Sequence, residues 1–139
     1  MTVFEHPIHP QFYDFDMVGV VHNVVYIRWL EDARTAFLLL SGWPMERLMA
    51  SDLSPALTHT TIDYKKAIRP AQAVLLRARV LSFGKSAWEL DFTFVHPETS
   101  AVYAAARQRG CFVRPSLMRP APMPAEFATF FAQYLAPET

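Results

Sequence analysis

One stretch constrains this chain more than any other. Residues 23–41 have the period of a long helix and follow directly on a loop at residues 13–22 that carries two aspartates, two aromatic residues and a glycine. Asn23 can cap the start of this helix, and Gly42 followed by Pro44 can end it. Apolar side chains recur at intervals of three or four: Val25, Trp29, Ala33, Phe37 and Leu40. We therefore expect one amphipathic helix whose N-terminus receives a loop that carries two aspartates.

Most of the remaining chain has the pattern of β-strands. Alternating apolar and polar residues, rich in β-branched and aromatic types, predict strands at residues 3–13, 56–64, 73–83, 86–96 and 101–113. Pro7 and Pro10 favour an edge position for the first strand. A helical turn is expected at 44–54, an extended segment at 114–124 and a second helix with an aromatic stripe at 125–135. This order predicts an α+β fold, with a five-stranded antiparallel sheet against one long helix, in a single domain spanning residues 1–139.

Composition excludes several classes of function. The 139 residues are 52% hydrophobic, enough for a sizeable core, and the formal net charge is zero, which argues against nucleic-acid binding. Cys111 is the only cysteine, so no disulfide forms within the chain. There is no apolar run of about 20 residues and no signal-peptide pattern, so we expect a cytoplasmic protein without a membrane segment.

The loop and the helix together carry a family resemblance. The motif D-x-D-x-x-G, followed by V-V-H-N-V-V-Y and W-L-E-D-A-R, resembles the 4-hydroxybenzoyl-CoA thioesterase-like branch of the hotdog-fold thioesterases. The matching residues are Asp14, Asp16, Gly19, Asn23, Tyr26, Trp29, Glu31, Ala33 and Arg34. The His22-Asn23 pair departs from the family, which has either Tyr-His or two consecutive asparagines there. The resemblance implies a hotdog fold, hydrolysis of acyl-CoA thioesters, and a homodimer or tetramer with its active sites at subunit interfaces.

Asp16 is the first candidate for catalysis. Thioester cleavage needs a nucleophile or a base, and hydrogen-bond donors for the oxyanion that develops on the carbonyl oxygen. A carboxylate just before a helix N-terminus can meet the first need, and the free N–H groups of the helix can meet the second. The resemblance assigns the catalytic role to the second aspartate, as nucleophile or as general base. From the residues alone, a local turn made by the Asp16 side chain is the simpler interpretation, and Asp14 is expected to be structural.

The start of the helix supplies further polar candidates. His22 and Asn23 can each hydrogen-bond the thioester carbonyl or position a water molecule. The simpler alternatives are a surface histidine and a helix cap. Glu31 follows His22 by nine residues, a spacing that another hotdog branch uses for its working carboxylate. A salt bridge from Glu31 to Arg28 or Arg34 is the simpler interpretation.

The remaining candidates would bind the substrate. Gly19 lets the backbone approach a ligand closely, and the N–H groups near Val20 and Val21 are expected to polarise the thioester carbonyl. Tyr26 is expected to shape the acyl pocket or simply to pack in the core.

Three cations are expected to bind the phosphates of CoA: Lys65, Lys66 and Arg69. They follow the second predicted strand, where the nucleotide of the family often lies. No metal site is expected, because no spaced set of His or Cys accompanies the two aspartates. No cofactor is expected apart from CoA as part of the substrate.

Three other functions stay open. An acyl carrier protein thioesterase would use the same chemistry but needs a basic docking face in place of a nucleotide pocket. A hydratase would use His22 with a carboxylate, although its usual motifs are not evident. A non-catalytic acyl-CoA-binding module would bind the thioester without turning it over.

Overall fold

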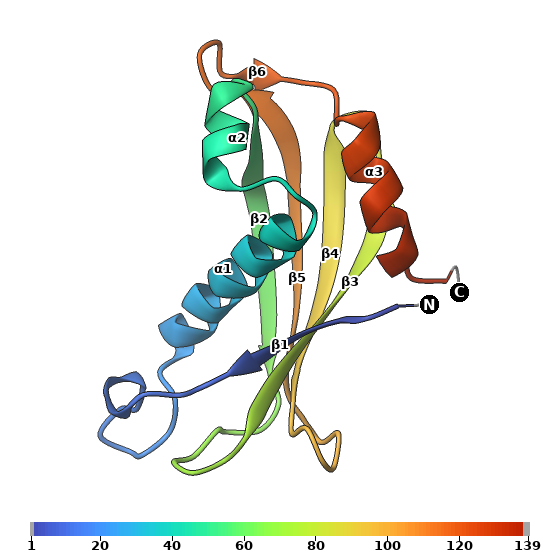
Figure 1. The fold of residues 1–139 in the computed structure, drawn as a ribbon. Helices are drawn as coiled ribbons and strands as arrows, with labels where there is room; N and C mark the ends of the chain where they lie inside the picture. Colours follow the sequence, from blue (N-terminus) through green and yellow to red (C-terminus); the bar gives the residue numbers. More distant parts are fainter. Residues whose placement is uncertain (1, 138–139) are drawn as a thin grey trace.

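A long helix lies in the concave face of a curved antiparallel sheet (Figure 1). The computed structural model describes residues 2–137. The long helix is α1, Asn23–Leu40. The sheet order is β1-β3-β4-β5-β2, and a two-residue strand, β6, pairs with β5. The strands are β1 Phe4–Ile8, β2 Ser54–Tyr64, β3 Val74–Phe83, β4 Ala87–Val95, β5 Val102–Arg114 and β6 Arg119–Pro120.

The predicted fold is therefore confirmed: five main strands wrap one helix, and β1 lies at an edge. The first strand is shorter than expected. It ends at Ile8 and is followed by a 3-10 helix, Phe12–Asp14. Pro10 cannot donate a ladder hydrogen bond, and the Asp14 carboxylate accepts the N–H of Gln11 at 2.7 Å, which turns the chain away from the sheet.

The structure differs from the prediction at the N-terminal end of α1 and agrees with it at the C-terminal end. The helix begins after His22, which makes no capping bond with its side chain, so the prediction that Asn23 caps the helix is wrong. The C-terminal end follows the prediction. Gly42 has φ +83°, and its N–H donates to Leu39 O, while the N–H of Trp43 donates to Leu38 O. This Schellman arrangement satisfies the last helical carbonyls and uses the left-handed conformation that glycine adopts freely.

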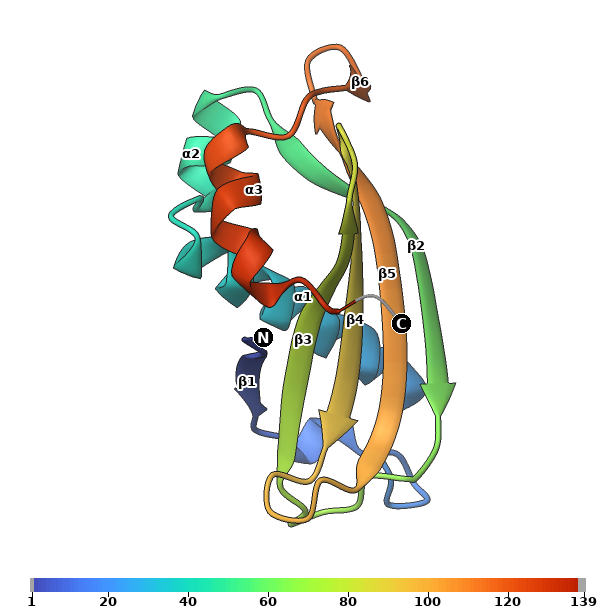
Figure 2. The same ribbon diagram turned by 90° about the vertical axis from the view of Figure 1, so that its right-hand side faces the viewer.

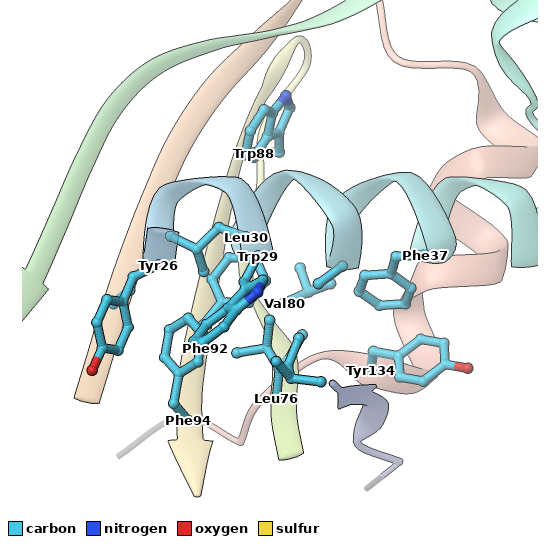
Figure 3. Close-up of a cluster of buried hydrophobic side chains, with 14 of the residues drawn as sticks. Tyr26, Trp29, Leu30, Phe37, Leu76, Val80, Trp88, Phe92, Phe94 and Tyr134 are labelled. Carbon is cyan, nitrogen blue, oxygen red and sulfur yellow. The ribbon is translucent and has the colours of Figure 1, made fainter. Parts of the chain in front are cut away.

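The core lies between α1 and the inner face of the sheet (Figure 3). Four of the five predicted apolar positions of α1 are buried, whereas Leu40 is exposed. On the strands, alternate residues point inward as the pattern predicted. The buried residues on β3 and β4 are Val74, Leu76, Ala78, Val80, Trp88, Phe92, Phe94 and Val95.

The other two helices lie on the same side of the sheet as α1 (Figure 2). They are α2, Met45–Ala50, and α3, Ala125–Phe131, and α3 continues into a 3-10 turn, Ala132–Tyr134. The aromatic stripe of the C-terminal segment packs in the core, with Phe131 and Tyr134 both edge-on to Phe37. No helix within residues 2–137 is long and apolar enough to cross a membrane.

Candidate active site

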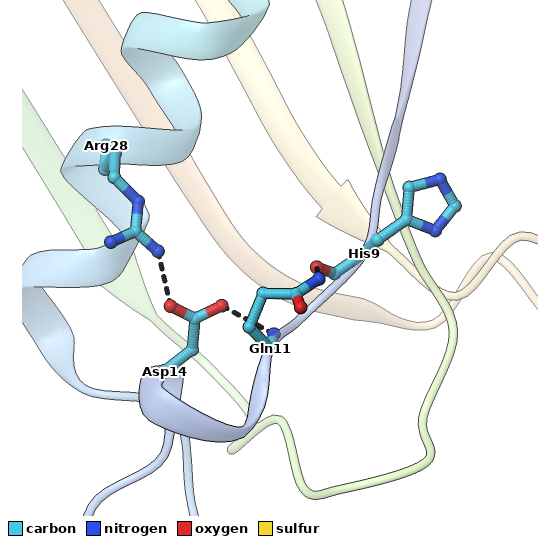
Figure 4. Close-up of polar contacts among 4 residues, drawn as sticks. All are labelled: His9, Gln11, Asp14 and Arg28. Carbon is cyan, nitrogen blue, oxygen red and sulfur yellow. Dashed lines mark hydrogen bonds and ion pairs between the residues drawn. The ribbon is translucent and has the colours of Figure 1, made fainter.

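Asp14 fastens the loop before α1 to the rest of the molecule (Figure 4). Its side chain is 1% exposed, pairs with the Arg28 guanidinium and accepts the N–H of Gln11. Its backbone oxygen accepts the N–H of His22 at 3.0 Å. The hydrogen bond from Arg28 to Asp14 raises the pKa of the guanidinium. These contacts agree with the expectation that Asp14 has a structural role.

Asp16 has a different environment, only two residues away. It is partly buried, and its Oδ1 accepts the N–H of Val18 at 2.9 Å and the N–H of Val20 at 3.3 Å. The turn is closed by the N–H of Gly19, which donates to Asp16 O at 3.0 Å, and Gly19 has φ +83°. The expected local turn is therefore present. It leaves Oδ2 without a hydrogen-bond partner within residues 2–137, so this oxygen is available for chemistry.

Asp16 and Gly19 line an open groove of about 970 Å³. The groove lies between the loop, β1 and the connection from β2 to β3, and its walls are mainly apolar. His9 and Gln72 also line it. Neither residue was among the candidates that the sequence indicated. No spacing in the sequence links either residue to Asp16, because the groove is formed by the tertiary arrangement of three segments.

The backbone donors around Val20 and Val21 that were expected to polarise the carbonyl are all bonded within the protein. The N–H of Val20 donates to Asp16 Oδ1, that of Val21 to Ile68 O and that of His22 to Asp14 O. In contrast, the N–H groups of Asn23 and Val24 have no acceptor in the part of the chain that the structure describes. A carbonyl at the start of α1 would meet these two donors, which also lie at the positive end of the helix dipole.

None of the predicted site residues at the helix start lines the groove. His22 and Asn23 are exposed at the beginning of α1 and do not line it. Tyr26 is buried in the core, edge-on to Tyr64 and Phe94 with ring centroids 5.1 and 5.2 Å away. Burial, and secondarily Tyr64, raises the pKa of Tyr26 to about 12. The structure therefore agrees with the expectation that Tyr26 packs in the core.

The three predicted phosphate-binding cations are exposed in the connection between β2 and β3. This connection is held to the Asp16 loop, because Ile68 O accepts the N–H of Val21 at 3.0 Å. It is also ordered by its own bonds. The N–H groups of Lys65 and Lys66 both donate to Tyr103 O at 2.9 Å, and the N–H of Arg69 donates to Gln72 Oε1 at 2.7 Å. The structure thus brings the basic segment beside the loop that carries Asp16.

Glu31 lies about 12 Å along the helix from Asn23, at 1.5 Å per residue, and does not line the Asp16 groove. It pairs with Arg34, whereas its other expected partner, Arg28, pairs with Asp14. Within residues 2–137 there is no cluster of three His, Cys, Asp or Glu side chains that could hold a metal ion.

Comparisons with known proteins agree with this arrangement. Residues 10–131 match the family model described as the thioesterase-like superfamily. A curated relative, the acyl-CoA thioester hydrolase YbgC of Escherichia coli, is 24% identical over 132 residues, which cover 95% of this chain and 98% of YbgC.

Solved structures show the same fold at low sequence identity. Slr0204, a 1,4-dihydroxy-2-naphthoyl-CoA thioesterase from Synechocystis, superposes with a TM-score of 0.87 at 17% identity, covering 98% of this chain and 100% of the other. SAV2348 from Staphylococcus aureus, solved in complex with CoA, superposes with a TM-score of 0.90 at 11% identity, covering 99% and 89%. The chain therefore belongs to the thioesterase-like superfamily of hotdog-fold thioester hydrolases.

Proposed function

We propose that this protein hydrolyses acyl-CoA thioesters to a free acid and CoA, with Asp16 as the working carboxylate. One observation carries the proposal: the Asp16 carboxylate lines a groove, with one oxygen fixed by two backbone N–H groups and the other without a hydrogen-bond partner among residues 2–137. A fixed carboxylate that can still reach a substrate is suited to act as general base or nucleophile. The match to the thioesterase-like superfamily and to YbgC supports thioester substrates.

In the general-base route, Asp16 Oδ2 removes a proton from a water molecule as its oxygen adds to the thioester carbon. The carbonyl oxygen becomes an oxyanion, which needs hydrogen-bond donors. The N–H groups of Asn23 and Val24 do not line the groove, and they would stabilise the oxyanion where the thioester extends from the groove to the start of α1. The C–S bond then breaks, and the CoA sulfur leaves as a thiolate and takes up a proton. In the nucleophilic route, Asp16 itself attacks the carbon, CoA leaves, and water hydrolyses the resulting anhydride.

Substrate recognition in this proposal divides between two regions. The apolar walls of the groove would accept the acyl part and the pantetheine arm of CoA. Lys65, Lys66 and Arg69 would bind the phosphates, since they are exposed beside the same loop. No cofactor apart from the CoA of the substrate takes part, and the cytoplasmic location stays a prediction.

We further propose that the working unit is a homo-oligomer, at least a dimer. Four large apolar side chains on and beside the Asp16 loop are more than 70% exposed: Phe12, Tyr13, Met17 and Val18. Exposed apolar patches of this kind commonly mark protein interfaces. The eleven-residue strand β2 also has no neighbour on its outer side among the described residues, and such an open edge readily pairs with another chain.

The test is release of the CoA thiol from short, long and aromatic acyl-CoAs by wild type and Asp16→Asn. Asparagine keeps an oxygen that can accept the N–H groups of Val18 and Val20 but cannot act as base or nucleophile. We expect a loss in kcat/KM of about a hundredfold or more, with unchanged circular dichroism. Glu31→Gln is the matched control and should retain activity, because Glu31 lies outside the groove.

Two results would overturn the proposal. If Glu31→Gln loses activity and Asp16→Asn does not, the working carboxylate is on the helix. If wild type binds acyl-CoA saturably but releases no thiol, the protein either binds without catalysis or takes its substrate from an acyl carrier protein. Hydrolysis of an acyl carrier protein thioester by the same preparation would then separate these two alternatives.

A further inference from the structure

The turn between β5 and β6 forms one end of the molecule, and the loop that carries Asp16 lies at the opposite end (Figures 1 and 2). Residues 114–119, with the sequence R-P-S-L-M-R, make up this turn, which we call the tip. Leu117 and Met118 are its two large apolar side chains, and they are 62% and 79% exposed. Exposed apolar side chains that stand together commonly mark a surface that binds a partner protein or a membrane.

Hydrogen bonds hold the tip in an ordered conformation. The N–H groups of Leu117 and Met118 both donate to Arg114 O, at 3.0 and 2.7 Å. Ser116 donates from its N–H to Asp52 Oδ1 at 3.1 Å and from its hydroxyl to the other carboxylate oxygen. Asp52 lies in the connection between α2 and β2, so these bonds attach the tip to a second segment of the chain. An ordered tip lowers the entropic cost of binding.

The backbone of Met118 indicates a role for its side chain. Its φ is +50°, in the left-handed region that residues other than glycine and asparagine seldom adopt. Because the side chain is mostly exposed, packing inside the protein does little to offset this strain. Strained backbone is concentrated at functional sites, so a methionine in this position favours a binding role for the tip.

Three exposed cations accompany the tip: Lys85, Arg114 and Arg119. Arg114 and Arg119 flank the two apolar residues and are paired across the ladder between β5 and β6. Lys85 lies in the turn between β3 and β4, which is held at the same end of the sheet because the N–H of Phe112 donates to Ser86 O at 2.8 Å. None of the three cations forms a salt bridge within residues 2–137, so their charges are available to an anionic partner.

One carboxylate lies beside these cations. The hydrogen bonds from Ser116, and less strongly the charge of Arg114, lower the pKa of the Asp52 carboxyl group, so Asp52 is ionised at neutral pH. Three cations and one carboxylate leave a formal charge of +2 on this group of side chains. The tip therefore combines a net positive charge with exposed apolar side chains, the combination that an anionic membrane surface attracts.

We propose that the tip docks on the surface of a bilayer that contains anionic phospholipids. Leu117 and Met118 would enter the boundary between headgroups and acyl chains, and the three cations would contact the lipid phosphates. A free phosphate would leave the apolar side chains in water, and an apolar protein surface would leave the cations without partners. Docking of this kind needs no helix that spans the membrane. It places the Asp16 loop away from the bilayer and does not depend on the proposed function of the groove.

The first experiment measures cosedimentation of the protein with vesicles of phosphatidylglycerol and phosphatidylcholine, and with vesicles of phosphatidylcholine alone. Wild type should bind the anionic vesicles about tenfold or more tightly, and added salt should weaken this binding. The double variant Leu117→Gln with Met118→Asn removes the apolar side chains and keeps the turn, because asparagine adopts the left-handed conformation. It should weaken binding about tenfold or more.

Two further double variants test the charges. Arg114→Gln with Arg119→Gln should weaken binding to the anionic vesicles about tenfold or more. Arg107→Gln with Arg109→Gln is the matched control, because it removes the same charge from exposed residues of the same strand. Arg109 lies about 17 Å before Arg114, at about 3.4 Å per residue, so this pair should change binding less than about threefold. Circular dichroism verifies the fold of each variant.

Leu117→Trp tests whether the tip itself enters the bilayer. Trp29, Trp43 and Trp88 are buried, so a change in emission on adding vesicles would come mainly from residue 117. The emission should shift to shorter wavelength with the anionic vesicles and not with phosphatidylcholine alone.

Four results would overturn the proposal. If wild type does not bind the anionic vesicles, the partner of the tip is not a membrane. If the double variant at Leu117 and Met118 binds them as wild type does, the contact lies elsewhere. Equal losses in the two arginine pairs would show a general attraction in place of a docking site. Sedimentation of the Leu117 and Met118 variant as a smaller species than wild type would show that the tip contacts a second copy of the chain.

Discussion

Asp14 and Asp16 show how far the surroundings of two similar residues can differ within one loop. Asp14 is buried and paired with a cation, so its charge holds the loop against α1. Asp16 keeps one oxygen free at a groove. A buried carboxylate with a fixed partner is costly to disturb, whereas a half-exposed one can exchange partners during a reaction. Because the two side chains are chemically identical, their different burial and hydrogen-bond partners account for the difference between them.

Tyr26 provides a test of the core at the scale of one residue. Its folded pKa of about 12 exceeds the ordinary value of 10.0. Between these pH values the unfolded chain loses the phenol proton and the folded chain keeps it. Stability from this residue is therefore complete below pH 10 and is lost as the pH rises towards 12, by about 2 to 3 kcal/mol. Tyr26→Phe should remove this loss, measured as urea unfolding free energy at several pH values.

The measurements well below pH 10 are the internal control for that series, because neither state of wild type has lost the Tyr26 proton there. The difference in unfolding free energy between Tyr26→Phe and wild type should be constant in that range and should change in favour of Tyr26→Phe above pH 10. A constant difference between Tyr26→Phe and wild type across the series would show that Tyr26 titrates equally in both states, against the burial described here.

For single residues, the sequence identified those whose neighbours along the chain form a motif and missed those that depend on contacts between distant segments. The D-x-D motif marked both aspartates, and the expectation that Asp14 is structural agrees with its buried pair with Arg28. Nothing local predicted that Arg28, fourteen residues away, would pair with Asp14 in place of Glu31. His9 was missed for the same reason, since it joins Asp16 only through the folding of β1 against β3.

Among the elements, each main strand lies within a few residues of its predicted range at both ends except β1. The alternation of apolar and polar residues predicts the strands well, because each strand buries one face and every second residue points to that face. The ends of elements depended on tertiary contacts. β1 stops early because Asp14 captures the N–H of Gln11, and α1 begins after a residue whose side chain makes no cap.

Gly110 on β5 tests the packing of two strands against each other. A Cβ there would lie 2.1 Å from Ala56 O and 2.2 Å from the ring of Trp88, so Gly110→Ala forces β2 or the indole to move. We expect a loss of about 1 to 3 kcal/mol or more in unfolding free energy, the usual cost of overpacking. Denaturant unfolding measures it.

Gly84→Ala is the matched control, because the nearest atom to its Cβ would be Ala87 Cβ at 3.5 Å, an ordinary contact. The two variants make the same chemical change, so a difference between them reports the close approach at Gly110. Equal stability of both variants would mean that Trp88 moves aside at little cost. The packing around the Trp88 indole would then be easily deformed.

Across the whole molecule, one hollow lies near each end of α1. The groove near its start is lined by Asp16 and lies beside exposed cations, and a hollow of about 580 Å³ near its other end is bordered by α1, α2, α3 and the sheet. The sequence singled out Asp16 and Gly19, which line the first of these, because functional residues are often found on loops. It could not predict the second, whose wall comes from α1, α2, α3 and the sheet and has no motif of its own.

The exposed apolar patch beside the groove leads to the last prediction, which concerns assembly. Met17 is fully exposed on the Asp16 loop, next to Val18 at 77%. If a second copy covers this patch, Met17→Glu would bury a charge at the interface, a costly change. Analytical ultracentrifugation should show wild type as a dimer or tetramer and Met17→Glu shifted towards monomer. Thioesterase activity should fall in parallel if the interface orders the loop.

Met118→Glu makes the same change at a residue that is 79% exposed in the turn between β5 and β6, far along the chain from the loop. It should sediment as wild type does, which separates a specific interface from a general effect of added charge. A monomeric wild type at micromolar concentration would contradict the prediction. The groove would then have to work with its apolar rim in water, and the four exposed side chains would need another partner.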